Sequence, residues 1–278
     1  MDTPVFLEYT SSAVPILNEL LPEQLEYNSK HEIKTPNLLA KYLFFDNKNI
    51  HQDLTSASSH VYYVLSGSGK TIIKDQVVFW NEGDVLTIPY MDHVTHISFH
   101  GTILFYANDS PLLEYLNCKP EKSRFKPTYY CGHEMLKQIQ YFNNEEGAEN
   151  RNRNGILISN NQMVNEKINT LTHTMWSLLN SISPHTVQKP HKHNSIAIDL
   201  CLSAEDNQVY TLMGKELNDD GSVKSPIKRY WKANSIFITP PGWWHSHHNE
   251  SESEAWVFPI QDAGLHTHIN TLDIQFVN

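Results

Sequence analysis

The chain has 278 residues, with 21 Lys and Arg against 31 Asp and Glu, so its formal net charge is −10. Hydrophobic residues make up 40% and charged residues 19%, a balance that excludes disorder along the whole chain. An acidic chain without a basic stripe gains little from counterion release, so we expect no nucleic-acid partner. The composition has one anomaly, which is 16 His beside only 3 Cys.

The N-terminus and the cysteines indicate the compartment. Residues 1–21 lack a cationic stretch ahead of an apolar core, and no apolar window is long enough for a membrane helix. Cys118, Cys131 and Cys201 are widely spaced and form no Cys-x-x-Cys pair, which argues against a disulfide framework. These features predict a soluble, cytoplasmic protein without a membrane partner.

Taken in chain order, the predicted elements form two similar halves. Residues 13–25 suggest a short amphipathic helix interrupted by Pro22. The strands predicted next are 38–45, 61–65, 70–73, 77–80, 85–88, 96–99 and 102–106. Helical pieces at 111–116 and 133–142 and a polar connector at 143–155 then precede a second set of strands. That set is 172–182, 195–202, 208–212, 228–231, 235–238, 255–259 and 271–276.

Many short strands joined by turns indicate an all-β fold of sandwich or barrel type. We divide the chain into an N-terminal arm (1–35), a first β-domain (36–117), a linker with short helices (118–155) and a second β-domain (156–278). The two β-domains also resemble each other.

The internal resemblance is clearest at one turn and strand. Asn81–Pro89 and Lys232–Pro240 each run from a turn through an apolar strand to a Pro, and His residues follow in both. Two copies of one fold explain this pattern most simply.

The second domain concentrates histidines at a spacing that suits a metal. His191 and His193 lie two residues apart, so they share one face of an extended chain. His245 follows 52 residues after His193, and in a small barrel it can reach a neighbouring strand that faces this pair. Three neutral imidazoles on one wall form a facial metal site that leaves the opposite side of the ion open. Scattered polar loop residues are the alternative interpretation, which the combined spacing disfavours.

These motifs resemble those of the cupin superfamily, whose fold is a jelly-roll β-barrel. The shared pattern is His191-x-His193 followed by Pro240-x-Gly242-x-x-His245-x-x-x-Asn249. Most metal-binding cupins add a Glu five residues after the second His, where this chain has Ile198. A three-His set resembles the gentisate 1,2-dioxygenase-like bicupins, which are related to salicylate and 1-hydroxy-2-naphthoate dioxygenases. The segments 109–116 and 261–274 add to this likeness.

The resemblance implies two cupin domains and an Fe(II)-dependent dioxygenase. It would hold Fe(II) through the three His, with Zn, Mn or Ni as alternative metals, and would cleave a small hydroxylated or amino-substituted aromatic acid with O₂. It also implies a homo-oligomer, a dimer or tetramer, in which the arm (1–35) is the element we expect to reach a neighbouring subunit.

The first domain departs from the metal-binding pattern. The alignment places Asp53 and Thr55 where the His pair would stand, His60 at the Glu position and Val94 in the slot of the third ligand. We expect a metal-free packing domain, with a second metal at Asp53, His60 and His93 as the alternative.

Two further residues of the second domain bear on catalysis. The family's Arg that engages the substrate carboxylate, eight residues after the first ligand His, is Asp199 here. An acid repels a carboxylate unless it is protonated or paired, so Asp199 faces either an amino substituent of the substrate or a Lys or Arg of the protein. His247 matches a family His beside substrate and oxygen, and it could shuttle a proton or stabilise an oxyanion.

Two other functions remain open at the level of sequence. A three-His site with an open position also suits catalytic zinc, as in a hydrolase or isomerase. A non-catalytic bicupin that binds a small molecule would use the same residues without turnover.

Overall fold

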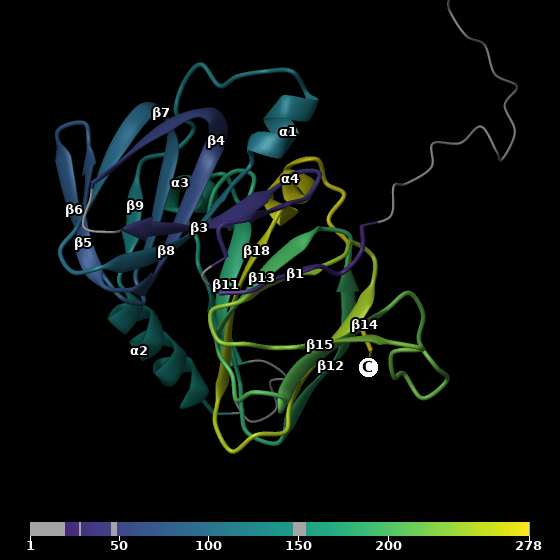
Figure 1. Cartoon of the computed structure of the whole chain (residues 1–278). Helices are drawn as coiled ribbons and strands as arrows, with labels where there is room; N and C mark the ends of the chain where they lie inside the picture. Colours follow the sequence, from purple (N-terminus) through teal and green to yellow (C-terminus); the bar gives the residue numbers. More distant parts are fainter. Residues whose placement is uncertain (1–19, 28, 46–48, 147–153, 278) are drawn as a thin grey trace, which may run out of the picture.

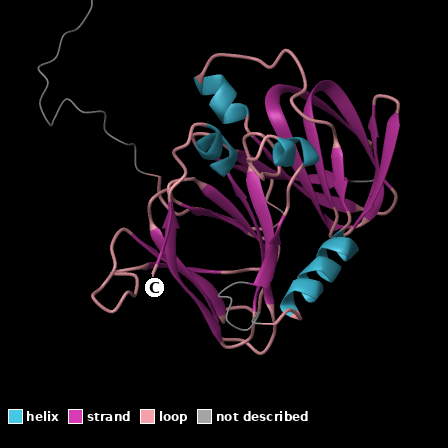
Figure 2. Cartoon of the chain, turned by 180° about the vertical axis from the view of Figure 1, so that it is seen from behind, coloured by secondary structure: helices cyan, strands magenta, loops and turns pink. Residues whose placement is uncertain are grey.

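The computed structural model describes residues 20–27, 29–45, 49–146 and 154–277. In this part of the chain the structure is built mainly of antiparallel strands, in two β-units that lie side by side (Figure 1). The N-terminal unit is one rolled eight-stranded sheet, and the C-terminal unit is a pair of sheets with six and five strands. Helices lie around the strands rather than between them (Figure 2). The predicted all-β class is therefore confirmed.

The first half of the chain forms the N-terminal unit and its flanking elements. Its strands and helices are β1 (Gln24–Leu25), β2 (Glu32–Lys34), β3 (Leu39–Phe45), β4 (Ile50–Ser66), β5 (Ser68–Ile73), β6 (Gln76–Asn81), β7 (Val85–Ser98), β8 (Thr102–Asn108), α1 (Ser110–Tyr115), β9 (Thr128–Tyr130) and α2 (Gly132–Asn143). The sheet order is β2-β3-β8-β4-β7-β5-β6, and β9 pairs with β7.

The second half forms the C-terminal unit. Its elements are β10 (Asn154–Leu157), α3 (Asn161–Asn165), β11 (Trp176–Ile182), β12 (Thr186–His193), β13 (Ala197–Ser203), β14 (Val209–Gly214), β15 (Ile227–Tyr230), β16 (Ile236–Thr239), β17 (Trp244–Asn249), β18 (Ala255–Gln261), α4 (Ala263–His268) and β19 (Ile274–Phe276). One sheet has the order β1-β16-β13-β18-β11-β10 and the other β15-β14-β17-β12-β19.

The two units repeat one topology, as the internal resemblance predicted. The long strands β4 and β7 each run through both halves of the N-terminal roll, and β4 changes register against β7 between Leu54 and Ser59. In the C-terminal unit the corresponding paths are split into β12 with β13 and β16 with β17. When this split is allowed for, the strand orders of the two units agree. The order β7-β4-β8-β3 in the N-terminal unit corresponds to β16-β13-β18-β11 in the C-terminal unit. The order β6-β5-β7-β4 corresponds to β15-β14-β17-β12.

Among the described residues, three hydrophobic clusters organise the packing. One contains Tyr62, Trp80 and Ile88 inside the N-terminal roll, and another contains Cys201, Trp231 and Phe237 inside the C-terminal one. The third cluster contains residues of both units. Burial of this shared apolar surface stabilises the two units as one body.

Polar contacts also join the units. Asp109, which is 1% exposed, accepts hydrogen bonds from the Ser58 and Ser59 backbone N–H groups, at 2.8 and 3.1 Å, and from the Ser58 hydroxyl. It also accepts a hydrogen bond from the Thr174 hydroxyl of the C-terminal half at 2.8 Å. A buried carboxylate with this many donors anchors the junction.

Several predicted elements differ from the structure. The helix predicted over 13–25 is contradicted at its described end, because Gln24–Leu25 is a strand that pairs with Phe237 and Ile236 of β16; residues 1–19 lie outside the described part. The described part of the arm thus extends two sheets of the same chain, because β1 pairs with β16 and β2 pairs with β3. The helical pieces predicted at 111–116 and 133–142 are confirmed as α1 and α2, whereas α3 and α4 were not predicted. Within the described residues, no helix combines the length and apolarity that crossing a bilayer requires.

Candidate metal centre

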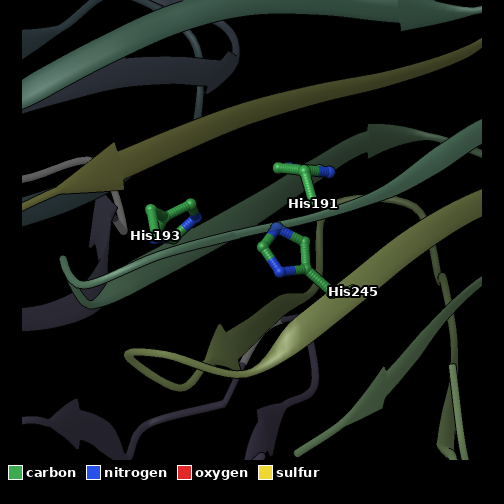
Figure 3. A group of neighbouring side chains, drawn as sticks. All are labelled: His191, His193 and His245. Carbon is green, nitrogen blue, oxygen red and sulfur yellow. The ribbon is translucent and has the colours of Figure 1, made fainter. Parts of the chain in front are cut away.

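The three predicted metal ligands come together in the C-terminal unit. His191 and His193 lie at the end of β12, and His245 lies on the adjacent β17 directly opposite His191 (Figure 3). One nitrogen from each ring lies within 4.8 Å of the others, and all three residues are buried. Among the described residues, no other group of three His, Cys, Asp or Glu forms such a cluster.

Local strand geometry explains this convergence. Alternation places His191 and His193 on the same face of β12, and β17 pairs with β12 in the antiparallel sense. The register shifts between Gln188 and His191, and such an irregularity re-aims the side chains that follow it. The rings of His191 and His245 are only 3.9 Å apart between centroids.

Backbone carbonyls fix the tautomer of all three imidazoles. Nδ1 of His193 donates to the Ser195 carbonyl at 2.8 Å, and Nδ1 of His245 donates to the Trp243 carbonyl at 3.0 Å. Nδ1 of His191 makes a longer bond, 3.4 Å, to the Lys189 carbonyl. A proton held at Nδ1 leaves the lone pair on Nε2, which is the arrangement of metal-ligating histidines. The donor set therefore fits a transition-metal ion.

His247 lies beside the cluster, and its Nδ1 bonds a side-chain hydroxyl instead of a backbone carbonyl. Its Nδ1 is 2.8 Å from the Thr211 hydroxyl, which itself accepts the indole N–H of Trp231 at 2.8 Å. The hydroxyl thus bridges the indole and the imidazole, and toward Nδ1 it can act as either donor or acceptor. Its ring centroid is 5.6 Å from that of His245 and 5.8 Å from that of His191.

Asp199 lies on β13, on the inner face of the C-terminal barrel. Its strand neighbours Ile198 and Leu200 belong to the cluster shared by the two units, whereas Cys201, two residues on, belongs to the cluster inside the barrel. Alternation places Asp199 on the side of Cys201. The carboxylate is 6% exposed and accepts a hydrogen bond from the Thr239 hydroxyl at 2.5 Å. Ile198, in the family's Glu position, faces away from the barrel interior.

A cavity of about 260 Å³ opens beside the cluster. Its lining includes His191 and His193, the polar residues Asn180 and Gln261, and a wall of larger apolar side chains, which are Ile156, Leu157, Trp176, Leu178, Ile274 and Phe276. The last two belong to β19, which pairs with β12 at His191 and His193. Asn180 and Gln261 were not singled out in the sequence, because a lone amide within an apolar strand carries no motif.

The corresponding place in the N-terminal unit lacks a metal-ligating set. Val94 stands five residues after Pro89, as His245 does after Pro240, and the residue opposite it is Gln52. The predicted alignment, which put Asp53 at the first His, is therefore one residue out of register. Asp53 is exposed and its carboxylate accepts hydrogen bonds from Thr55.

His60 and His93 do not join Asp53 in a site of three ligands. His60 is fully buried and hydrogen-bonds the Tyr106 hydroxyl at 2.8 Å, and burial lowers its pKa to about 4. His93 lies opposite Asp53 on β7 and is exposed.

One polar trio occurs in both units. Thr71, Trp80 and His96 repeat the contacts of Thr211, Trp231 and His247, with distances of 2.8 Å from the Thr71 hydroxyl to His96 Nδ1 and 2.9 Å from the indole nitrogen of Trp80 to that hydroxyl. The strand registers agree, since Thr71 pairs with His96 and Thr211 with His247. Counting seven residues from Pro89 and Pro240 would have found this match in the sequence.

Comparison with known proteins identifies the fold. The structure is similar to salicylate 1,2-dioxygenase from Pseudaminobacter salicylatoxidans, with a TM-score of 0.67 and 11% identity over 87% of this chain and 75% of that one. The adduct of that enzyme with gentisate gives a TM-score of 0.66 at 11% identity, over 87% and 72% of the chains. A cupin 2 conserved barrel domain protein from Leptotrichia buccalis gives 0.52 at 12% identity, over 90% and 92%.

No protein-family model and no curated sequence matches the chain. The likeness thus rests on the fold, and the chain has the two-barrel fold of a bicupin. The predicted resemblance to this architecture is confirmed.

Proposed function

We propose that this protein is a non-haem Fe(II)-dependent dioxygenase that oxidises a small hydroxylated or amino-substituted aromatic compound. The observation that carries the proposal is the buried group of His191, His193 and His245, each with Nδ1–H bonded to a backbone carbonyl. The bicupin fold shared with a salicylate 1,2-dioxygenase supports it.

The three Nε2 atoms would hold the metal. Three neutral imidazoles leave the charge of a divalent ion uncompensated, so the site favours an anionic chelating group such as a phenolate. When bound, Fe(II) would supply open coordination positions and would pass electrons from the substrate to O₂. Zn, Mn and Ni suit the same nitrogen ligands and are the alternatives.

His247 is the residue we assign to proton handling. With the Thr211 hydroxyl donating to its Nδ1, His247 would carry its proton on Nε2 and donate a hydrogen bond from there to negative charge that develops on substrate or oxygen. The Trp231 indole packs against it, with ring centroids 5.6 Å apart, and limits its rotation. These contacts pre-organise the donor before substrate arrives.

Asp199 is the second residue we place in the catalytic machinery. Its buried carboxylate lies on the inner face of β13, and Thr239 orients it. Asp199 is not among the residues that line the cavity, so it would act through its negative charge, which favours an amino substituent and disfavours a second carboxylate. The apolar cavity wall, with Trp176 and Leu178, excludes water from the reacting ring.

We further propose that the N-terminal unit is metal-free and serves to support the C-terminal barrel. Val94, Gln52 and the buried Leu54 occupy the positions that correspond to the ligands. We also propose that the first domain begins at residue 36, the linker at residue 118 and the second domain at residue 156. The chain is further proposed to form a homo-oligomer.

The test is anaerobic purification, elemental analysis and O₂ uptake by Fe(II)-loaded protein with a panel of hydroxy- and aminobenzoates, catechols and aminophenols. Iron near one equivalent per chain with substrate-dependent O₂ uptake supports the proposal. Stoichiometric zinc without iron would indicate a metal-activated-water enzyme instead. Tight binding of a panel member without turnover by the iron form would indicate a small-molecule-binding bicupin.

A further inference from the structure

The cavity beside the histidines contains no charged carboxylate or cationic side chain among the described residues that line it. Its polar positions are His191, His193 and two primary amides, Asn180 and Gln261. At about 260 Å³ it is smaller than the sites that take drug-sized ligands, so it suits a single ring with few substituents. A substituent that reaches this wall therefore meets neutral hydrogen-bonding groups.

Asn180 is buried without a side-chain hydrogen-bond partner among the described residues. It is 4% exposed, and its Oδ1 is buried and unsatisfied. Trp176 and Leu178 alternate with it on the same face of β11, and all three line the cavity. A buried amide without a partner costs free energy, and a bound ligand that supplies the missing groups recovers it.

The backbone next to Asn180 keeps this position open. Gly155 of β10 pairs with Asn180, and a Cβ at residue 155 would lie 2.6 Å from the Leu179 carbonyl oxygen and 3.2 Å from the Asn180 Cβ. Glycine at 155 thus lets β10 close over β11 without a side chain covering the amide.

Gln261 presents the second amide in a fixed orientation. Its Oε1 accepts the Ser195 hydroxyl at 2.9 Å, and the carbonyl of Ser195 accepts Nδ1–H of His193. With Oε1 committed to Ser195, the NH₂ group of Gln261 is the part available to a ligand. The Asn180 Oδ1 needs a donor, and the Gln261 NH₂ group needs an acceptor. A ligand substituent that both donates and accepts hydrogen bonds suits this pair.

From these contacts we propose that Asn180 determines substrate specificity, and that the substrate ring carries an uncharged polar substituent, such as a carboxamide or hydroxyl, against Asn180 and Gln261. The inference rests on the proposed function for the part of the substrate that would chelate the metal. It adds that the preferred substrate class is an uncharged phenolic compound rather than a benzoate.

The experiment compares two catechols that chelate a metal in the same way and differ only in the remaining substituent. Binding of protocatechuate and of its primary amide, protocatechuamide, is measured by calorimetry on the full chain loaded with redox-inert Zn(II). One additional neutral hydrogen-bonded pair predicts at least about tenfold tighter binding of the amide. Asn180→Leu and Asn180→Ala should each reduce that preference, leaving only the part that Asp199 contributes, whereas Asn165→Leu, at an exposed position of α3, should retain it in full.

Two results would overturn the proposal. One is equal or tighter binding of the carboxylate by the wild-type chain. The other is an Asn180 variant that folds and keeps the wild-type ratio of the dissociation constants of protocatechuate and protocatechuamide. Asn180→Ala serves for this comparison if Asn180→Leu does not fold. Neither readout depends on turnover, so an iron form that binds protocatechuamide tightly but consumes no O₂ would count against the proposed function alone.

Discussion

The partner of each Nδ1 atom decides what each histidine in the C-terminal barrel can do. Carbonyl oxygens accept the Nδ1 protons of His191, His193 and His245, whereas Nδ1 of His247 bonds a hydroxyl. The first three rings therefore carry their lone pairs at Nε2. At the scale of residues, this difference supports the roles that we propose, which are metal ligands for the first three rings and hydrogen-bond donor for the fourth.

Removing one ligand tests this assignment. His245→Ala should weaken metal binding at least about 100-fold, because two imidazoles cannot complete the facial set. His248→Ala is the control, since His248 faces the other side of β17 and stacks on Tyr210, with ring centroids 4.8 Å apart. Metal content after dialysis against a weak chelator is the measurement, and equal retention by both variants would contradict the assignment.

A second prediction at this scale concerns pH and stability. Burial lowers the pKa of His96 from 6.5 to about 3. Below about pH 6.5 the unfolded chain binds a proton that the folded chain does not, so the free energy of unfolding falls as pH decreases, by about 1.4 kcal/mol per pH unit for this group. His60, with a pKa lowered to about 4, adds to the same slope.

The measurement is denaturant unfolding between about pH 7.5 and 4.5. His96→Gln should show a shallower dependence on pH than the wild type, because the variant lacks the proton uptake on unfolding. Identical slopes for the two proteins would show that His96 is not held neutral in the folded chain.

At the scale of elements, the Thr–Trp–His trio occurs in both units, including the one without a three-histidine cluster. The trio therefore belongs to the structure of each barrel and does not depend on a metal site. It joins β14, β15's end and β17 in one unit and β5, β6 and β7 in the other. Because only the C-terminal trio adjoins the three-histidine cluster, the chain contains its own control for the catalytic contribution that we propose for this trio.

Thr211→Val and Thr71→Val form the matched pair. Each leaves a buried indole N–H without its acceptor and should lower the free energy of unfolding by about 1–3 kcal/mol. Only Thr211→Val frees the His247 ring, so only this variant should lower kcat for O₂ uptake with its iron content unchanged. Equal loss of kcat in both variants would assign the effect to general destabilisation.

Features that depend on residue spacing along one strand could be predicted from the sequence, whereas the long strands that pass through both halves of the roll could not. The convergence of His191, His193 and His245 follows from alternation along a strand and a Pro-x-Gly turn, both of which are local. The full lengths of β4 and β7 were missed because exposed polar residues such as His51 and Asp53 interrupt the apolar pattern where the strands pass between the two halves of the roll. Asn180 acquires its meaning only from the strands beside it.

At the scale of the whole molecule, the two units share a core and should unfold together. The shared cluster includes the contact of Tyr63 with Phe258, and the Tyr42 hydroxyl donates to the Asn234 carbonyl at 2.6 Å. Asp109 adds its buried contacts to both halves. We therefore expect one calorimetric transition, although each unit is large enough to have a core of its own.

Asp109→Ala should lower the stability of the whole molecule by about 3 kcal/mol, because it leaves buried donors on both sides of the junction without an acceptor. Calorimetry is the measurement, and the wild type and the variant should each give a single peak. Two resolved transitions in the wild type would show that the shared core does not couple the units.

The most direct test of the central claim is the fate of isotopically labelled O₂. Fe(II)-loaded wild-type protein, given the aromatic compound that it binds most tightly, should incorporate both atoms of one O₂ into a single product, and His245→Ala should incorporate neither. A fully iron-loaded wild-type protein that binds such a compound and yet leaves the label in O₂ would contradict the assignment of His191, His193 and His245 as the centre of a dioxygenase.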